Sequence, residues 1–129
     1  PWTDGEIEDL MHTRSNWAFV ARSADRPERV AGFTVLRTAV DEAEILTIAV
    51  KPSWQRHGVG RMLMDSALQR AYTERFASIF LEVGETNRAA RALYTKLGFI
   101  SVGERRNYYQ HADGTRGNAI VMRRDFAKR

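Results

Sequence analysis

The sequence predicts a mixed α/β (α+β) fold, with a mostly antiparallel sheet, a central parallel strand-helix-strand unit and helices on both faces. Three observations lead to this prediction. Strand-like runs of alternating apolar residues flank the middle of the chain. Two segments, 60–76 and 87–97, repeat their apolar residues at helical spacing. A strand, a helix and a strand follow one another at 41–50, 60–76 and 78–83, which implies a right-handed parallel crossover.

The 129 residues suffice for one hydrophobic core, and we expect residues 1–129 to form a single domain. Thr3 and Glu6 have the spacing of a capping box, which predicts a short helix over 3–11. A meander of three strands should follow, with a polar loop between the first two, at 16–21, 29–38 and 41–50.

The helix predicted over 60–76 is amphipathic, because Leu63, Met64, Ala67 and Leu68 recur at helical spacing opposite polar residues. It should therefore pack on the sheet. The remaining elements are a buried strand, a helix closed by Gly98, and a hairpin across an Asp113-Gly114 turn, at 78–83, 87–97, 99–109 and 118–124.

Composition excludes several classes of function. With 43% hydrophobic and 28% charged residues, the chain has an ordinary globular composition, and no apolar run approaches the roughly 20 residues that span a bilayer. The absence of cysteine excludes disulfides, thiolate metal sites and cysteine nucleophiles; it is compatible with a reducing compartment, so the cytoplasm is the expected location. His12, His57 and His111 lack metal-ligand spacing, so no metal is expected.

The net charge of +4 favours acidic partners such as phosphate ligands or RNA. The alternative is that an arginine-rich surface is simply solvated. The pairs Arg105-Arg106 and Arg123-Arg124 lie in strand-like runs, where alternation turns one member of each pair to a given face. They do not form a continuous basic stripe, so nucleic acid is not an expected partner.

The segment 55–61, Gln-Arg-His-Gly-Val-Gly-Arg, lies between a predicted strand and a predicted helix. Backbone N–H groups at a helix start are unpaired and carry the positive end of the helix dipole, so the segment predicts a diphosphate site. Arg56 and Arg61 would add positive charge. The string Gly-x-x-x-x-Gly-Lys-Ser/Thr is absent, and Leu63 stands where a dinucleotide fingerprint needs its third glycine. The alternative is a glycine-containing turn that only opens the helix.

Further motifs surround this segment in a regular order. They are Ala-Glu-Ile-Leu-Thr-Ile-Ala-Val before it, then Leu81-Glu82-Val83, Asn87 with Ala89-Ala90, Ala92-Leu93-Tyr94, Leu97-Gly98-Phe99 and Arg105-Arg106-Asn107-Tyr108-Tyr109. From Glu44 to Met122, their order and spacing resemble the ribosomal-protein-alanine N-acetyltransferases (the RimI type) of the GCN5-related N-acetyltransferase (GNAT) superfamily. The Arg-Arg-Asn-Tyr-Tyr run is more specific than the glycine loop.

This resemblance implies the GNAT fold, acetyl-CoA as co-substrate, and direct transfer of the acetyl group to a protein N-terminus. It points to the N-terminal alanine of a small-subunit ribosomal protein. The alternatives are a small amine or another protein terminus as acceptor, or an interaction module that binds CoA without catalysis. The family normally has a strand and a helix before the first residue of this chain, and we expect the chain to lack them.

The resemblance also implies a set of CoA-binding residues. The glycine loop would hold the pyrophosphate mostly through its backbone. The preceding strand would pair with pantetheine, which requires splaying or a bulge between that strand and the strand of Glu82. The set is Ile48, Ala49, Val50, Arg56, His57, Gly58, Val59, Gly60, Arg61 and Asn87. Alternatives are core packing for 48–50 and helix capping for Asn87, and a capping Asn87 can also contact CoA.

Two residues are candidates for catalysis. Acetyl transfer needs a route for the amine proton and an acid for the departing thiolate. Glu82 is an acid in an otherwise apolar strand and matches the family's general base, with a structural salt bridge as the alternative. Tyr94 lies on an apolar helix face, so core packing is its alternative, whereas the resemblance implies that it protonates the CoA thiolate.

Tyr108 and Tyr109 lie where, by the resemblance, the last hairpin borders the acceptor groove. Adjacent strand residues face opposite ways, so we expect one tyrosine to contact the acceptor peptide and allow the other to be core. Gln110 stands where the family commonly has proline, and Gly117-Asn118 stands where an acidic residue is usual. Peptide selectivity can therefore differ from that of the family.

Overall fold

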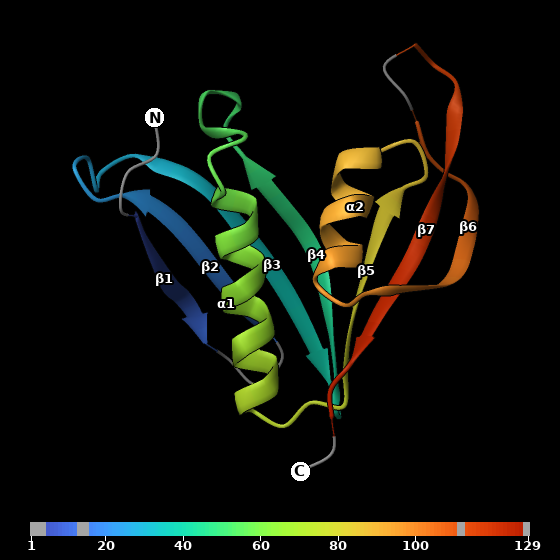
Figure 1. The fold of residues 1–129 in the computed structure, drawn as a ribbon, viewed down its shortest axis with the longest axis horizontal. Helices are drawn as coiled ribbons and strands as arrows, with labels where there is room; N and C mark the ends of the chain where they lie inside the picture. The colour runs from blue at the N-terminus through green and yellow to red at the C-terminus, as the bar shows by residue number, and fades with distance from the viewer. Residues whose placement is uncertain (1–4, 13–15, 111–112, 128–129) are drawn as a thin grey trace.

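The computed structural model describes residues 5–12, 16–110 and 113–127 (Figure 1). In this part of the chain, seven strands form one sheet, accompanied by two α-helices and a short 3-10 helix. In chain order the elements are β1 (Gly5–His12), β2 (Asn16–Ser23), β3 (Val30–Ala39), β4 (Glu42–Val50), η1 (Pro52–Trp54), α1 (Val59–Thr73), β5 (Ser78–Gly84), α2 (Arg88–Lys96), β6 (Ile100–Gln110) and β7 (Arg116–Asp125).

The strand order is β1-β2-β3-β4-β5-β7-β6, and β4 with β5 is the parallel pair among these neighbours. α1 connects those two strands, which confirms the predicted mixed sheet with a central strand-helix-strand unit. The parallel pairing runs only from Glu42↔Ser78 to Glu44↔Phe80. Beyond it the two strands separate, and Figure 1 shows the sheet opening as a V between them.

The prediction of a short helix over 3–11 is wrong. Gly5–His12 forms β1, which pairs antiparallel with β2 and carries an irregularity between Asp9 and Met11. Thr3, half of the expected capping box, lies outside the described residues. A capping box is a local signal, and pairing with a neighbouring strand supplies the same backbone groups with hydrogen bonds, so tertiary context overrides it.

The core lies between the sheet and the helices. α1 buries the apolar face that its sequence predicts, including Leu63, Met64 and Ala67, against the first four strands. α2 contributes Tyr94 to the same cluster, which continues into Leu97 and Phe99 after the helix. One continuous core therefore supports both helices.

Both α-helices lie on the same side of the sheet (Figure 1), which differs from the predicted helical layer on each face. The strand order gives the reason. The connections β4-α1-β5 and β5-α2-β6 both move in the same direction across the sheet between parallel strands. Two right-handed crossovers in one direction must place their helices on one face. The opposite face is covered by no helix of the described residues.

Candidate active site

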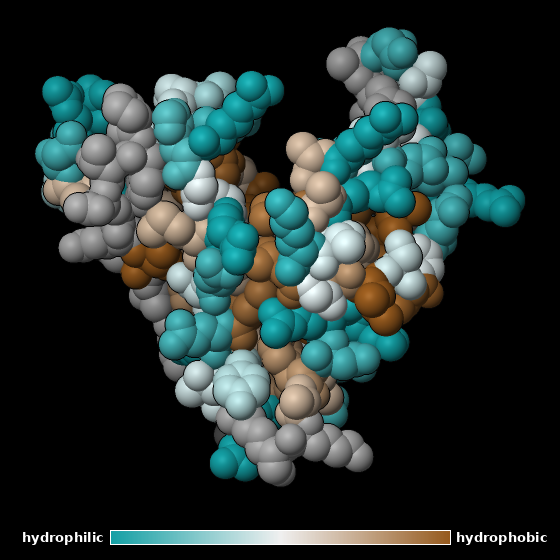
Figure 2. All heavy atoms as spheres, viewed as in Figure 1, coloured by the Kyte–Doolittle hydropathy of each residue, from teal (hydrophilic) through white to brown (hydrophobic). Residues whose placement is uncertain are grey.

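A cleft opens between the start of α1 and α2. Its volume is about 380 Å³, and Figure 2 shows the hollow between the two upper lobes of the molecule. Its walls combine the glycine loop with apolar side chains of α2. The lining residues are Val50, Trp54, Gln55, Arg56, Gly58, Val59, Gly60, Arg61, Ala89, Ala90 and Leu93.

The start of α1 has the features of an anion site. Gly58 is the N-cap residue, with a left-handed φ of 80°, and no side chain caps the helix. The first turn holds no acidic residue. The N–H groups of this turn therefore face the cleft side without a capping oxygen, and the helix dipole adds positive potential. The residues present thus fit a diphosphate such as that of CoA.

Predicted CoA-binding residues are distributed unevenly over this cleft. Val50 and five loop residues line it, whereas Ile48 packs against the core and Ala49 is exposed. His57 is absent from the lining, and its ring lies edge-on to Trp54 at 6.3 Å. Sequence reasoning did not assign Trp54, Ala89, Ala90 or Leu93, because their place depends on how α2 approaches the loop.

The splaying predicted between this strand and the strand of Glu82 is present, because β4 and β5 have no paired residues beyond Glu44 and Phe80. The register between β3 and β4 shifts at Val35↔Thr47 and Leu36↔Ile45, which leaves Leu46 as a bulged residue. On the other side, β4 has no partner in β5 beyond Glu44. The β5-facing edge of 45–50 is therefore available for pairing with an extended ligand.

Asn87 caps α2, as the sequence predicts. Its Oδ1 accepts a hydrogen bond from the N–H of Ala90 at 3.2 Å. The helix then carries Tyr94 into the core, where the side chain is 7% exposed and its ring lies 6.0 Å from that of Phe99. Burial raises the pKa of the Tyr94 phenol above its ordinary value. Tyr94 is therefore a packing residue, and burial favours the protonated form of its phenol.

Glu82 projects from β5 to the face opposite the helices. Alternation buries its neighbours Leu81 and Val83 in the core, while the Glu82 side chain remains 19% exposed. Its Oε1 forms an ion pair with Nε of Arg105, at a distance of 2.7 Å. The ion pair expected as the alternative to catalysis thus exists, although an ion-paired carboxylate can still accept a proton.

A second cleft, of about 370 Å³, lies on the Glu82 side of the sheet. Its charged walls contain Glu82 with Arg105 and a second ion pair, Arg37–Glu44 at 2.6 Å. Phe80 and Val121 supply apolar surface. The two clefts share no lining residue.

Tyr108 lies on the Glu82 side as well, because the Arg105 guanidinium sits over its ring, 5.0 Å from the centroid. The Tyr108 side chain is 53% exposed. This placement follows from a bulge, since the pairs Arg105↔Ala119 and Tyr109↔Gly117 leave extra residues on β6. The side chain of Tyr109 lies outside the described part of the structure.

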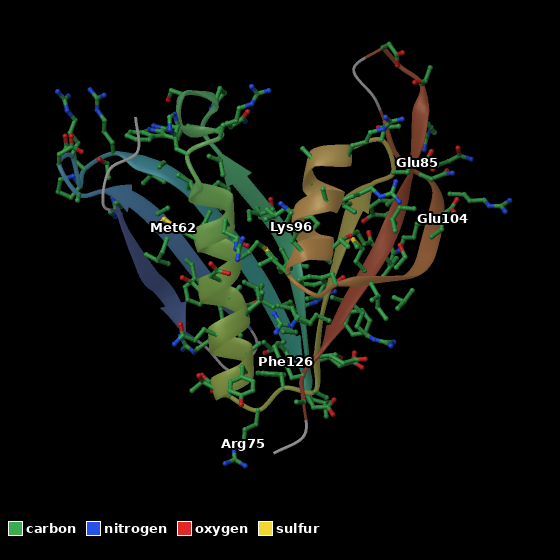
Figure 3. All side chains as sticks on the ribbon, viewed as in Figure 1. Met62, Arg75, Glu85, Lys96, Glu104 and Phe126 are labelled. Atoms are coloured by element: carbon green, nitrogen blue, oxygen red, sulfur yellow. The ribbon has the colours of Figure 1, made fainter. Side chains whose placement is uncertain are left out.

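Asn118 holds the bulge in place. Its Oδ1 accepts from the N–H of Asn107, whose φ is 53°, at 2.9 Å. Its Nδ2 donates to Glu104 at 2.9 Å and to Glu85 at 3.4 Å. Figure 3 labels those two acids, Glu85 directly after β5 and Glu104 on β6, the two strands that flank β7. Sequence reasoning noted Asn118 as a departure from the family but assigned it no role.

Among the described residues, no group of three or more histidine or acidic side chains could hold a metal ion. No α-helix in that part of the chain is long and apolar enough to cross a bilayer.

Comparison with known proteins adds a family. The sequence model of the acetyltransferase (GNAT) family matches residues 1–99. The [ribosomal protein bS18]-alanine N-acetyltransferase of Salmonella typhimurium is 42% identical over 95 residues, which are 74% of this chain and 64% of that protein. The match thus spans less than two thirds of that relative's length. The N-alpha-acetyltransferase RimI of Mycobacterium tuberculosis is 37% identical over 126 residues, covering 97% of this chain and 76% of that protein.

Solved structures agree with these relatives. The crystal structure of the ribosomal-protein-S18-alanine N-acetyltransferase from Escherichia coli superposes with a TM-score of 0.88 at 27% identity, covering 98% of this chain and 96% of that one. A Bacillus subtilis acetyltransferase in complex with CoA has a TM-score of 0.80 at 21% identity, covering 96% and 100%. The latter likeness concerns the fold alone.

Proposed function

The chain belongs to the acetyltransferase (GNAT) family, and on this premise we propose that it transfers an acetyl group from acetyl-CoA to a protein N-terminus. We further propose that the acceptor is the N-terminal alanine of a small-subunit ribosomal protein. Residues 1–129 would act as one acetyltransferase domain, which the single sheet from β1 to β6 supports. A ribosomal acceptor would place the reaction in the cytoplasm.

The cleft beside α1 is the proposed CoA site. Its uncapped helix start suits the pyrophosphate, and the side chains of Arg56 and Arg61 at its wall match the negative charge. The unpaired edge of β4 suits the amide groups of pantetheine, which can add to it as a strand would. From there the thioester would enter the gap between β4 and β5.

The proposed chemistry is a direct displacement. The neutral amine attacks the thioester carbonyl carbon, a C–N bond forms, and the C–S bond breaks as the tetrahedral adduct collapses. The amine proton passes to Glu82, directly or through water, and the departing thiolate takes a proton from Tyr94. The products are the acetylated N-terminus and CoA with a free thiol. The observation that carries this proposal is the position of Glu82 two residues beyond the last β4–β5 pair, at the gap.

The acceptor class is supported by amine chemistry and by the relatives. At pH 7.4 an α-amine is roughly a quarter neutral, whereas a lysine amine is neutral about once in a thousand molecules. An N-terminal amine is therefore more often already neutral, and it depends less on a general base for deprotonation than a lysine amine does. The Salmonella typhimurium relative is named for the alanine of ribosomal protein bS18, which supports the same acceptor here.

Mass spectrometry of a peptide panel with acetyl-CoA tests the proposal. The panel contains a peptide with a free N-terminal alanine, the same peptide with its N-terminus blocked, peptides with other N-termini, an N-blocked lysine peptide and a polyamine. We expect a single acetyl group on the free alanine and none on the blocked control. If the polyamine is acetylated faster than the peptides, the acceptor is a small amine and not a protein N-terminus. CoA binding by calorimetry without turnover on any acceptor would overturn the enzymatic proposal in favour of a binding module.

A further inference from the structure

The ion pair between Glu82 and Arg105 spans an intervening strand. Glu82 of β5 and Gly103 of β6 both pair with Val121 of β7, from its two sides. Arg105 lies two residues beyond Gly103, on the same face, and its side chain crosses β7 to bring Nε within 2.7 Å of Glu82 Oε1. This contact links the carboxylate to β6, the strand that carries Tyr108.

The guanidinium is itself held on its other side. Its carbon lies 5.0 Å from the centre of the Tyr108 ring, a cation–π distance. The β6 bulge that turns Tyr108 back over Arg105 is fixed by Asn118 through the N–H of Asn107. Tyr108, Arg105 and Glu82 therefore form one line of contacts from the exposed hairpin to the proposed base.

We propose that Arg105 is a positioning residue for acetyl transfer, which holds the Glu82 carboxylate at the β4–β5 gap and couples it to the acceptor contact at Tyr108. This role rests on the proposed function. The pair uses Oε1, so the lone pairs of Oε2 can accept from the amine or from a water. Arginine suits this task, because its planar group can pair at Nε and stack on an aromatic ring at the same time.

A purely structural role is the competing explanation, and exposure argues against it. The Arg105 side chain is 56% exposed, and ion pairs at such positions contribute little to stability because water screens them. If an Arg105 variant loses turnover but keeps its thermal stability, the cause is therefore the position of the Glu82 carboxylate and not damage to the sheet.

A double-mutant cycle tests the role. Turnover of the alanine-terminal peptide is measured for the wild type, Arg105→Gln, Glu82→Gln and the double variant, with thermal unfolding of each. We expect Arg105→Gln to lower kcat about tenfold or more, with the KM for acetyl-CoA within about twofold, because a misplaced base forfeits part of its contribution. In the Glu82→Gln background, the same substitution should change kcat by less than about twofold. Arg105→Lys should recover part of the loss.

Arg106→Gln is the matched control, since Arg106 is the next residue, is also exposed, and has no ion pair among the described residues. It should leave kcat unchanged. An equal loss from Arg105→Gln in both backgrounds, or no loss in either, would overturn the positioning role while the acetyltransferase activity stands. A wild type without turnover on the whole panel would overturn the proposed function, and this role with it.

Discussion

Glu82 follows Phe80 by two residues on β5, and Phe80 is the last residue of that strand to pair with β4. The two side chains share the face opposite the helices, so the carboxylate stands where the strands begin to separate. Tyr94 packs on the other face, in the cluster that contains Leu81 and Val83. A thioester in the gap would thus have the proposed base, Glu82, on one side and the proposed acid, Tyr94, on the other.

Glu82→Gln should lower kcat by about 100-fold or more, because general base catalysis typically contributes a factor of about 10² to 10⁴. The amide keeps the size of the side chain, so folding should be retained. Calorimetric binding of acetyl-CoA should remain within about twofold, since the cleft beside α1 does not contain Glu82. Unchanged turnover would remove the base role and leave Glu82 as a structural ion-pair partner.

Tyr94→Phe should slow transfer by about tenfold to 100-fold while acetyl-CoA binding persists, because the variant loses the proton for the thiolate. Burial raises the pKa of Tyr94, so wild-type Tyr94 should remain protonated from pH 6 to 9. If activity falls toward pH 9, the cause should therefore be the titration of another group and not of Tyr94. A rate equal to that of the wild type would leave Tyr94 with packing alone.

The same shift predicts how stability depends on pH. An unfolded tyrosine titrates near pH 10, and the folded pKa of Tyr94 lies higher. The unfolded chain therefore releases its proton first, so this contribution is fully present below about pH 10 and is lost as pH rises through the folded pKa. Urea unfolding at pH 8 and above pH 10 should show a smaller alkaline loss for Tyr94→Phe than for the wild type. An equal alkaline loss of stability in the two proteins would mean that the pKa of the Tyr94 phenol is not raised by folding.

Gly60→Ala should separate ligand binding from stability. The added methyl group would lie 3.9 Å from Val50 Cγ2, an ordinary contact, so the helix tolerates it. Stability should stay equal or rise by up to about 1 kcal/mol, because alanine favours helix over glycine. The methyl group enters the proposed CoA cleft, so acetyl-CoA affinity should fall about tenfold, or about 1.4 kcal/mol.

Gln69→Ala is the control for this variant, since Gln69 is exposed on the same helix and outside the cleft. It should leave affinity unchanged. Undiminished acetyl-CoA binding by Gly60→Ala would argue that the diphosphate does not approach this turn.

Local patterns were sufficient for most elements but not for their arrangement. The apolar spacing around Leu63 and Met64 predicted α1 and its buried face correctly, because a helix with one buried face repeats its apolar residues about every 3.6 positions. The position of both helices on one face depends on the strand order β5-β7-β6, which no local pattern contains. At β1 the capping signal of Glu6 pointed to the wrong element, since pairing with β2 decides it.

The site divides in the same way. The glycine loop and the Asn87 cap are each formed by residues that are close together in the sequence, so the turn before α1 and the cap of α2 could both be predicted. The contact of Arg105 with Glu82 depends on register across β7, and the role of Asn118 depends on a bulge. Such contacts join residues far apart in the chain, and a single sequence does not fix their register.

Gly32→Ala should destabilise the protein where β3 passes the CoA-facing part of β4. A methyl group on Gly32 would lie 2.6 Å from the carbonyl oxygen of Ala49 and 3.3 Å from Leu63 Cδ1. The first neighbour is backbone and cannot rotate away, so we expect a loss of about 1 to 3 kcal/mol in the free energy of unfolding, as for other overpacked sites. Urea titration gives this value from the midpoint and slope.

Gly103→Ala provides the comparison, because its methyl group would meet Val121 at an ordinary 3.8 Å. It should match or slightly exceed wild-type stability, since glycine within a strand carries an entropic cost. The Gly32 variant should also bind acetyl-CoA more weakly, because relief of the clash must move Ala49 and with it the open edge of β4. If the two variants are equally stable, β3 and β4 must lie further apart at Gly32 than the 2.6 Å distance between the added methyl group and the Ala49 carbonyl oxygen implies.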